Sequence, residues 1–232
     1  MPDATRFLTF SFDDGFRAST EKTAALFEEF ELRAEFHVVT AFGERDPARF
    51  GDWALWNALS ARGHSIQPHG YDHTNKAEVP LAVAQDSIRR CLDSFAENLH
   101  GFDAEKSIFG FPYLASTPEL EAWLPGVVRA FRTSGETLNP LPTRATTKLT
   151  TGAWPDAELR LDRCVDELLA RDSGWLIYCA HGLDGEGWGP LRSEYLKALL
   201  ERLTQAPNRE LLPARDVLRR FDATPQGEAA RP

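Results

Sequence analysis

An apolar segment that ends in two carboxylates is the feature that most constrains this chain. Residues 7–12 read Phe-Leu-Thr-Phe-Ser-Phe, and Asp13, Asp14 and Gly15 follow directly. A short run this rich in aromatic residues is typical of a buried strand in a parallel sheet. Because aspartates are rarely buried without a partner, two of them at the exit of a core strand need a metal, a cation or water. Asp-Asp-Gly is also common in turns that leave a strand, so the segment alone leaves both interpretations open.

Composition narrows the class of protein. The chain has 232 residues, of which 42% are hydrophobic and 26% charged, which is ordinary for a globular domain and within range for one α/β barrel. A net charge of −9 disfavours nucleic acid and anionic membranes as partners. We find no signal-peptide pattern and no apolar run of membrane-spanning length, so we expect a cytoplasmic protein. The three cysteines are too few and too scattered for a disulfide framework or a cysteine-type zinc site.

Strand and helix patterns alternate along the chain. We expect strands at residues 7–12, 34–38, 64–67, 107–111, 127–131, 175–180 and 211–213. We expect helices at residues 20–30, 52–62, 81–99, 161–170 and 214–221. Thr117 can cap a further short helix that starts with Pro118. The last large helix is marked by its apolar positions, Leu196, Leu199, Leu200 and Leu203. Residues 133–160 predict a long loop region, and the tail at 222–232 is expected to be disordered. The alternation predicts an α/β fold with a parallel sheet, and the absence of a linker predicts one domain over residues 1–221.

Polar side chains follow the ends of several predicted strands. The active sites of parallel α/β proteins form at the carboxyl ends of the strands, so we expect these residues to converge. They are Asp13 and Asp14 after the first strand, His69 and His73 after the third, Pro112 and Tyr113 after the fourth, and His181 after the strand at 175–180.

The histidine pair and the aspartate pair together indicate a metal site. His69 and His73 are four residues apart, a spacing that can bring two imidazoles together. One carboxylate would complete three protein ligands with an open position, as in catalytic zinc sites. Neighbouring residues of an extended chain point to opposite sides, so we expect Asp13 and Asp14 to do different work. The alternatives are surface histidines on a polar loop and, for His181, a core histidine bonded to the backbone.

These motifs in this order resemble the polysaccharide deacetylase family, whose shared unit is the NodB homology domain. They are Ser-Phe-Asp-Asp-Gly at 11–15, Gly-His-Ser-Ile at 63–66 leading to His-Gly-Tyr-Asp-His at 69–73, Phe-Pro-Tyr at 111–113, and Leu-Ile-Tyr-Cys-Ala-His at 176–181. The resemblance covers the chain from Phe7 to about Phe221. It implies a distorted (β/α) barrel of about seven strands. It also implies hydrolysis of an acetyl amide or ester with a divalent metal, zinc first and cobalt, nickel or manganese as alternatives.

The resemblance also implies a role for each site residue. By motif position the metal ligands are Asp14, His69 and His73. Asp13 would be the base that activates water, and His181 the acid that protonates the leaving group. The backbone N–H of Tyr113 would stabilise the oxyanion, which is usually the largest catalytic contribution.

The chain departs from the family pattern at two motifs that position the predicted base and the predicted acid. The family's third motif places an arginine two residues before the proline to brace the catalytic aspartate, and here that position is Gly110. Arg132 and Arg144 are the candidates to replace it. The family's Asp-x-x-Asp-Trp motif is not recognisable between Arg132 and Asp162. His37 stands where the family has a large apolar residue. We favour a structural role for His37 over a role in the active site.

The sequence therefore predicts a metal-dependent deacetylase acting on an N-acetylated sugar or related carbohydrate. Trp188, in the glycine-rich loop after His181, either stacks on a sugar ring or packs its own loop down. A hydrolase of a small non-sugar amide and an inactive relative that binds a glycan or a protein are the alternatives. The preference for N-acetyl or O-acetyl groups and the oligomeric state stay open.

Overall fold

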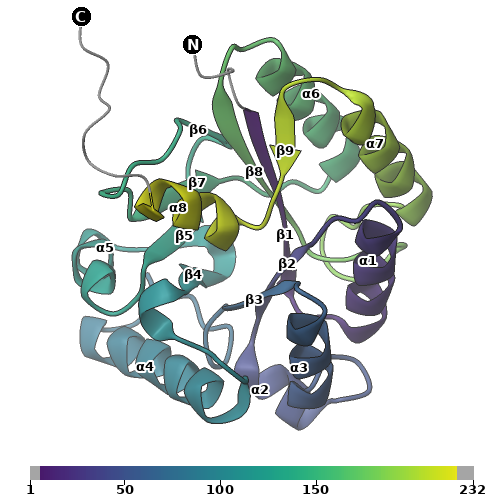
Figure 1. Cartoon of the computed structure of the whole chain (residues 1–232). Coiled ribbons are helices and arrows are strands. Elements are labelled where there is room, and N and C mark those ends of the chain that lie inside the picture. The colour runs from purple at the N-terminus through teal and green to yellow at the C-terminus, as the bar shows by residue number, and fades with distance from the viewer. Residues whose placement is uncertain (1–5, 224–232) are drawn as a thin grey trace, which may run out of the picture.

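The computed structural model describes residues 6–223 and shows an α/β fold in which helices surround mostly parallel strands (Figure 1). The strands are β1 (Arg6–Asp14), β2 (Glu35–Val38), β3 (Ser65–Pro68), β4 (Ile108–Gly110), β5 (Ala130–Ser134), β6 (Leu138–Asn139), β7 (Lys148–Thr151), β8 (Gly174–Ala180) and β9 (Arg209–Leu211). The α-helices are α1 (Arg17–Glu29), α2 (Thr40–Arg45), α3 (Trp53–Ala61), α4 (Leu81–Asn98), α5 (Pro118–Trp123), α6 (Ala157–Leu169), α7 (Ser193–Gln205) and α8 (Ala214–Ala223). Short 3-10 turns occupy Ala104–Lys106, Pro112–Leu114 and Leu124–Gly126.

The strands form two sheets. One has the order β3-β2-β1-β8-β6, with β9 pairing with the first residues of β1, and the other has the order β4-β5-β7. Every pairing is parallel except that of β6 with β8. All residues of β1 between its two end residues are buried, as expected for a strand with neighbours on both edges and helices outside.

Side chains join the two sheets where the backbone ladder is interrupted. At the seam between β3 and β4, the Ile108 N–H donates to Gln67 Oε1 at 2.7 Å. At the seam between β7 and β8, Thr151 Oγ1 donates to the Ile177 carbonyl at 2.7 Å. Seven parallel strands thus follow one another in the order β1, β2, β3, β4, β5, β7 and β8. This matches the predicted α/β fold of mostly parallel strands, with the backbone ladder interrupted at two seams.

Local sequence signals explain where several helices begin. The Asp52 carboxylate accepts the Leu55 N–H at the start of α3, and Thr117 Oγ1 accepts the Leu120 N–H at the start of α5. Both are side-chain N-caps, which satisfy amide groups that the first helical turn leaves free. The expected cap at Thr117 is therefore confirmed.

The prediction of a long loop over residues 133–160 is wrong. The region holds β6, the barrel strand β7 and the first turn of α6. Asn139 organises it, because its side chain accepts the Thr150 N–H at 3.0 Å and donates to the Thr150 carbonyl at 2.8 Å. The region has no clear apolar period, so tertiary pairing decides its structure instead of local pattern.

Three smaller expectations also change. The strand expected at 127–131 begins three residues later, at Ala130, and helix α2 was not expected at all. Helix α8 runs to Ala223, so the tail boundary at 222 was too early: Arg129 donates to the Asp222 carboxylate at 2.7 and 2.9 Å. The rest of the expected tail, 224–232, lies outside the described residues. Within residues 6–223, no helix is long and apolar enough to cross a membrane.

Candidate active site

The two aspartates at the end of β1 face different partners. Asp13 is the penultimate residue of the strand and is buried, whereas Asp14 is half-buried and has a left-handed backbone, φ +73°. This conformation is uncommon for a residue other than glycine, and it turns the second carboxylate away from the direction of the first. The two carboxylates therefore have different surroundings, as the alternation of side chains along a strand predicts.

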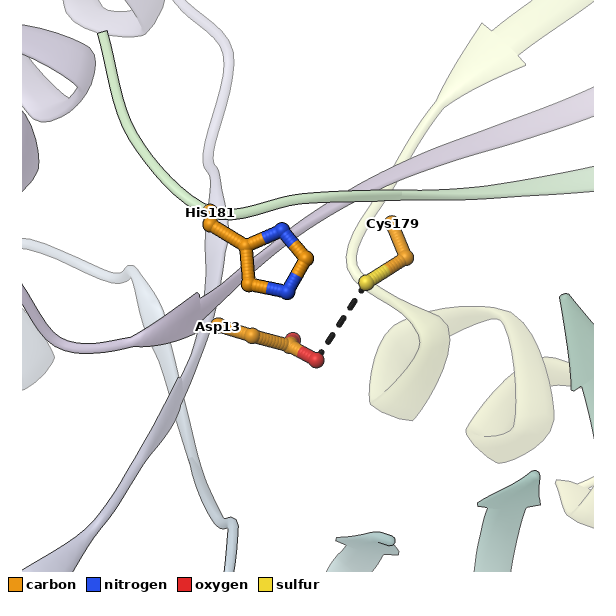
Figure 2. A group of neighbouring side chains, drawn as sticks. All are labelled: Asp13, Cys179 and His181. Carbon is orange, nitrogen blue, oxygen red and sulfur yellow. Dashed lines mark hydrogen bonds between the residues drawn. The ribbon is translucent and has the colours of Figure 1, made fainter. Parts of the chain in front are cut away.

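Asp13 is held by three side chains. Arg132 Nη2 donates to both carboxylate oxygens at 2.7 Å, and Ser11 Oγ donates to Oδ1 at 3.2 Å. The Cys179 thiol donates to Oδ2 at 3.2 Å (Figure 2). Burial alone would raise the pKa of Asp13, but the Arg132 guanidinium together with the neighbouring histidines outweighs it and holds that pKa well below its usual value. Burial raises the pKa of Cys179, so the thiol keeps its proton as a donor.

Arg132 on β5 takes the place of the arginine that the sequence pattern lacks on β4. Gly110 pairs with Arg132 in the register between these strands. A Cβ at Gly110 would lie 2.8 Å from Arg132 Nη2 and 2.6 Å from His37 Nδ1, closer than real Cβ contacts allow. The missing side chain therefore leaves the room that the arginine needs to reach Asp13. The other candidate, Arg144, donates to the Asp222 carbonyl and has no contact with the site.

Asp14 gathers with the two histidines that follow β3. Its Oδ1 atom lies 3.1 Å from His73 Nε2 and 3.8 Å from His69 Nε2. His69 Nδ1 is 2.9 Å from the Gly110 carbonyl, an acceptor, so Nδ1 carries the proton and Nε2 presents a lone pair. Burial lowers the pKa of His69 to about 3, which keeps the ring neutral at physiological pH.

The donors of this group fit a divalent metal ion. Among the described residues, the buried Asp14 Oδ1 has no hydrogen-bond partner, although such an atom is costly to leave unpaired. One carboxylate oxygen and one nitrogen each from His69 and His73 lie within 4.8 Å of one another. One carboxylate and two imidazoles are a ligand set that catalytic zinc uses with an open position.

A second group, of Asp13, Cys179 and His181, lies beside the first. Its ligand-type atoms are also within 4.8 Å of one another, but Arg132 already neutralises Asp13 and the thiol is protonated, so this group does not fit a cation. His181 follows β8 and is half-buried. Its imidazole lies over the Asp13 carboxylate in Figure 2. The structure thus brings the predicted base and the predicted acid to one place.

Tyr113 lies on the histidine side of the site. Its ring centroid is 4.7 Å from that of His73, and 66% of the residue is exposed. Its backbone is left-handed, with φ +58°. Strain of this kind is common at functional sites, and it fixes the direction of the Tyr113 amide.

The number and spacing of the cysteines gave Cys179 no role in the site. Cys179 and His181 are two residues apart at the end of one strand, and alternate residues share a face, so this signal was present in the sequence. His37 is fully buried and its Nε2 is 3.1 Å from Glu35 Oε1. Its ring centroid is 6.3 Å from that of His69, in an edge-to-face arrangement, so it packs against this histidine in the interior, which favours a structural role.

Comparisons with known proteins show the family and the fold of this chain. The family model for polysaccharide deacetylase matches residues 2–123. No curated protein sequence matches the chain. Among solved structures, PuuE allantoinase has a TM-score of 0.72 at 15% identity, covering 97% of this chain and 93% of its own. A predicted polysaccharide deacetylase from Mycobacterium smegmatis has a TM-score of 0.72 at 14% identity, with coverage of 100% and 96%. An acetyl xylan esterase from Clostridium thermocellum, solved with a cobalt ion, has a TM-score of 0.62 at 17% identity, with coverage of 92% and 91%.

Proposed function

Since the chain belongs to the polysaccharide deacetylase family, we propose that it is a metal-dependent hydrolase that removes the acetyl group of an N-acetylated sugar. One observation carries the proposal. Asp14 Oδ1, buried and without a hydrogen-bond partner among the described residues, faces two imidazoles, while the adjacent Asp13 is ionised and braced by Arg132. The chain thus separates the residues suited to hold a metal from those suited to move a proton.

Asp14, His69 and His73 would hold the ion. When bound, a divalent metal supplies a Lewis acid that polarises the acetyl carbonyl and acidifies the attacking water. The Gly110 carbonyl fixes the ring orientation of His69 through its bond to Nδ1. Partners of this kind orient the ligand and strengthen it. Zinc fits this ligand set, and cobalt, nickel and manganese are alternatives.

Asp13 is the proposed general base. Its low pKa means that it is ionised at neutral pH, so it can accept a proton from the water that attacks the acetyl carbon. Arg132 and Cys179 hold the carboxylate in one orientation through both of its oxygens. A base that is fixed in place before the reaction avoids the cost of ordering it during the reaction.

His181 is the proposed general acid. It is half-buried and lies beside the Asp13 carboxylate (Figure 2), so it can donate a proton to the departing nitrogen of the sugar. The strained backbone of Tyr113 is proposed to aim its N–H at the developing oxyanion. Water attack, carbonyl stabilisation and leaving-group protonation then use different residues.

A small non-sugar amide is the second candidate substrate, because the same groups serve any acetyl-type carbonyl and because an allantoinase shares the fold. An inactive binding protein is less well supported, since binding alone does not require this complete set of residues. The complete set comprises Asp13, Asp14, His69, His73 and His181. The expected cytoplasmic location remains part of the proposal.

Acetate release tests the proposed function. We expect the zinc-loaded wild type to release acetate from N-acetylglucosamine oligomers, and Asp13→Asn to lower kcat by about 10²–10⁴ with its metal content retained. Asp103→Asn is the matched control, because Asp103 bonds Lys106 on the surface at the far end of the barrel. Equal rates in Asp13→Asn and the wild type would contradict the assigned base. Saccharide binding without turnover in the metal-loaded wild type would support the binding protein.

A further inference from the structure

The segment from His69 to His73 is held to the rest of the protein in two ways. Backbone N–H groups at the start of α2 donate to the carbonyls of Gly70 and Tyr71 at 3.2 and 2.8 Å. The second half of the segment, which carries His73, is held by the side chain of Asp72. The position of His73 therefore depends on what fixes the Asp72 carboxylate.

His73 has a left-handed backbone, with φ +58°, which is uncommon for a residue other than glycine. The Thr74 N–H donates to Asp72 Oδ1 at 3.2 Å, so the aspartate side chain spans the residue that follows it in a local turn. This bond closes over His73 and holds the conformation in which His73 Nε2 lies 3.1 Å from Asp14 Oδ1. Asp72 thus fixes the direction of one of the proposed metal ligands.

Lys76 holds the Asp72 carboxylate in place. Its Nζ atom donates to Asp72 Oδ1 at 3.2 Å and to Ser87 Oγ, on helix α4, at 2.8 Å. Ser87 Oγ in turn donates to the same carboxylate oxygen at 3.4 Å. A Cβ at Gly70 would lie 3.8 Å from Lys76 Nζ, so the ammonium lies against the segment that joins the two histidines. The three side chains together attach this segment to α4.

The burial of Lys76 distinguishes it from a lysine that closes a surface turn. Lys106 forms a similar local pair with Asp103 at 2.6 Å, and 79% of the Lys106 side chain is exposed. Lys76, in contrast, is 0% exposed, although lysines are rarely buried without a partner. An apolar side chain of similar volume often stabilises a fold as well as a buried ion pair does. Stability alone therefore does not explain an ammonium at this position.

We propose that Lys76 and Asp72 are positioning residues for the metal centre, which fix the backbone of His73 before an ion binds. Lys76 acts through Asp72, and neither residue belongs to the group of ligand atoms. A ligand that is already in place does not have to be ordered when the ion binds, so the ion binds more tightly. This inference rests on the proposed function, since it concerns the metal ligands of that site.

Zinc affinity tests the inference without requiring turnover. The Kd for zinc is measured by competition with a chromophoric chelator, for the wild type, Lys76→Met, Asp72→Ala, Asp72→Asn and the double variant of Lys76→Met with Asp72→Ala. Lys76→Met removes the ammonium and keeps a flexible unbranched chain in its place. Lys106→Met is the matched control, because it makes the same change in the exposed pair with Asp103. Urea denaturation of the same proteins without metal measures their stability.

We expect Lys76→Met to raise the Kd for zinc about tenfold to a hundredfold, which is the usual cost of losing a group that orients a metal ligand. Asp72→Ala should raise it at least as much, and Asp72→Asn, which keeps an acceptor for the Thr74 N–H, should bind zinc more tightly than Asp72→Ala. Because Lys76 acts through Asp72, Lys76→Met should have little further effect in the Asp72→Ala protein. Lys106→Met should match the wild type.

The outcomes separate this inference from the proposed function. Lower stability in urea with unchanged zinc affinity in Lys76→Met and Asp72→Ala would assign both residues to the fold alone and overturn the inference. Zinc affinity that depends on Lys76, in a protein that releases no acetate from N-acetylglucosamine oligomers, supports the inference and contradicts the hydrolase. Acetate release with zinc affinity indifferent to both residues supports the hydrolase and contradicts the inference. A wild type that binds no zinc contradicts both.

Discussion

Two histidines lie at opposite ends of strand β3, one just before Ser65 and one just after Pro68. His64 and His69 are both buried, 0% and 1% exposed, and burial lowers the pKa of each. The Ala34 N–H donates to His64 Nδ1 at 3.1 Å, and His64 Nε2 lies 3.0 Å from Glu28 Oε1. The Nδ1 atom of His69 is hydrogen-bonded to the Gly110 carbonyl. The nearest acidic oxygens to its Nε2 atom belong to Asp13 and Asp14, at 3.6 and 3.8 Å.

The difference separates a structural histidine from one available for chemistry. At the amino end of β3 both ring nitrogens of His64 are bonded, so the ring can only stabilise the fold. At the carboxyl end the free lone pair of His69 needs a further partner. In parallel α/β proteins the carboxyl ends of the strands carry catalysis and the amino ends carry stability, and these two residues show that division within six positions of the chain.

The largest expected effect is the loss of activity when His69, but not His64, is replaced. We expect His69→Ala to lower kcat/KM for acetate release about a thousandfold or more, because several kcal/mol of transition-state stabilisation depend on the metal. His64→Ala should keep kcat/KM within about twofold but lower the free energy of unfolding by about 2–4 kcal/mol, since the Ala34 N–H loses its acceptor and the missing ring leaves a cavity. Steady-state kinetics and urea denaturation measure both. Equal losses of activity in the two variants would remove the distinction.

A smaller loss is expected from one methyl group at Gly110. The new Cβ of Gly110→Ala would press on Arg132 Nη2 and His37 Nδ1, and a displacement of this size at a catalytic group costs about tenfold to a hundredfold in kcat. Gly126→Ala is the matched control, because no described atom lies within 4 Å of its added Cβ. If the kcat of Gly110→Ala equals that of Gly126→Ala, then the position of Arg132 against Asp13 does not matter for catalysis.

The smallest effect concerns pH and the amino end of β3. Burial holds the pKa of His64 below 6.5, so below that pH the unfolded chain binds a proton that the folded protein excludes. Stability contributed by neutral His64 is therefore present above pH 6.5 and is lost as the pH falls. The slope for one group is at most about 1.4 kcal/mol per pH unit.

Urea denaturation of metal-free wild type and His64→Gln at pH 7.0 and 5.5 measures this effect. We expect the wild type to lose more stability than His64→Gln over this interval, by at most about 1 kcal/mol. Because His69 is present in both proteins, its own titration cancels in the difference. Parallel losses in the two proteins would mean that His64 is not kept neutral by burial.

The comparison also shows what the sequence could predict. Local patterns predicted the strand at 7–12, the positions of Asp13 and His69 at strand ends, and the parallel order of the strands. The apolar period and the turn residues that define these features lie within the same short segments of sequence. Arg132 could be named only as one of two candidates, since its role depends on the register between β4 and β5. The strand β7 was missed because its pairing with β5 and the amide of Asn139, not its own composition, define it.

Metal content is the measurement that tests the account most directly. Wild type, His69→Ala and His64→Ala are purified identically without chelator, incubated with zinc, desalted and assayed by plasma mass spectrometry. The account predicts about one divalent ion per chain in the wild type and in His64→Ala, and almost none in His69→Ala. A wild type that retains no metal, or a His69→Ala protein that retains as much as the wild type, would contradict it.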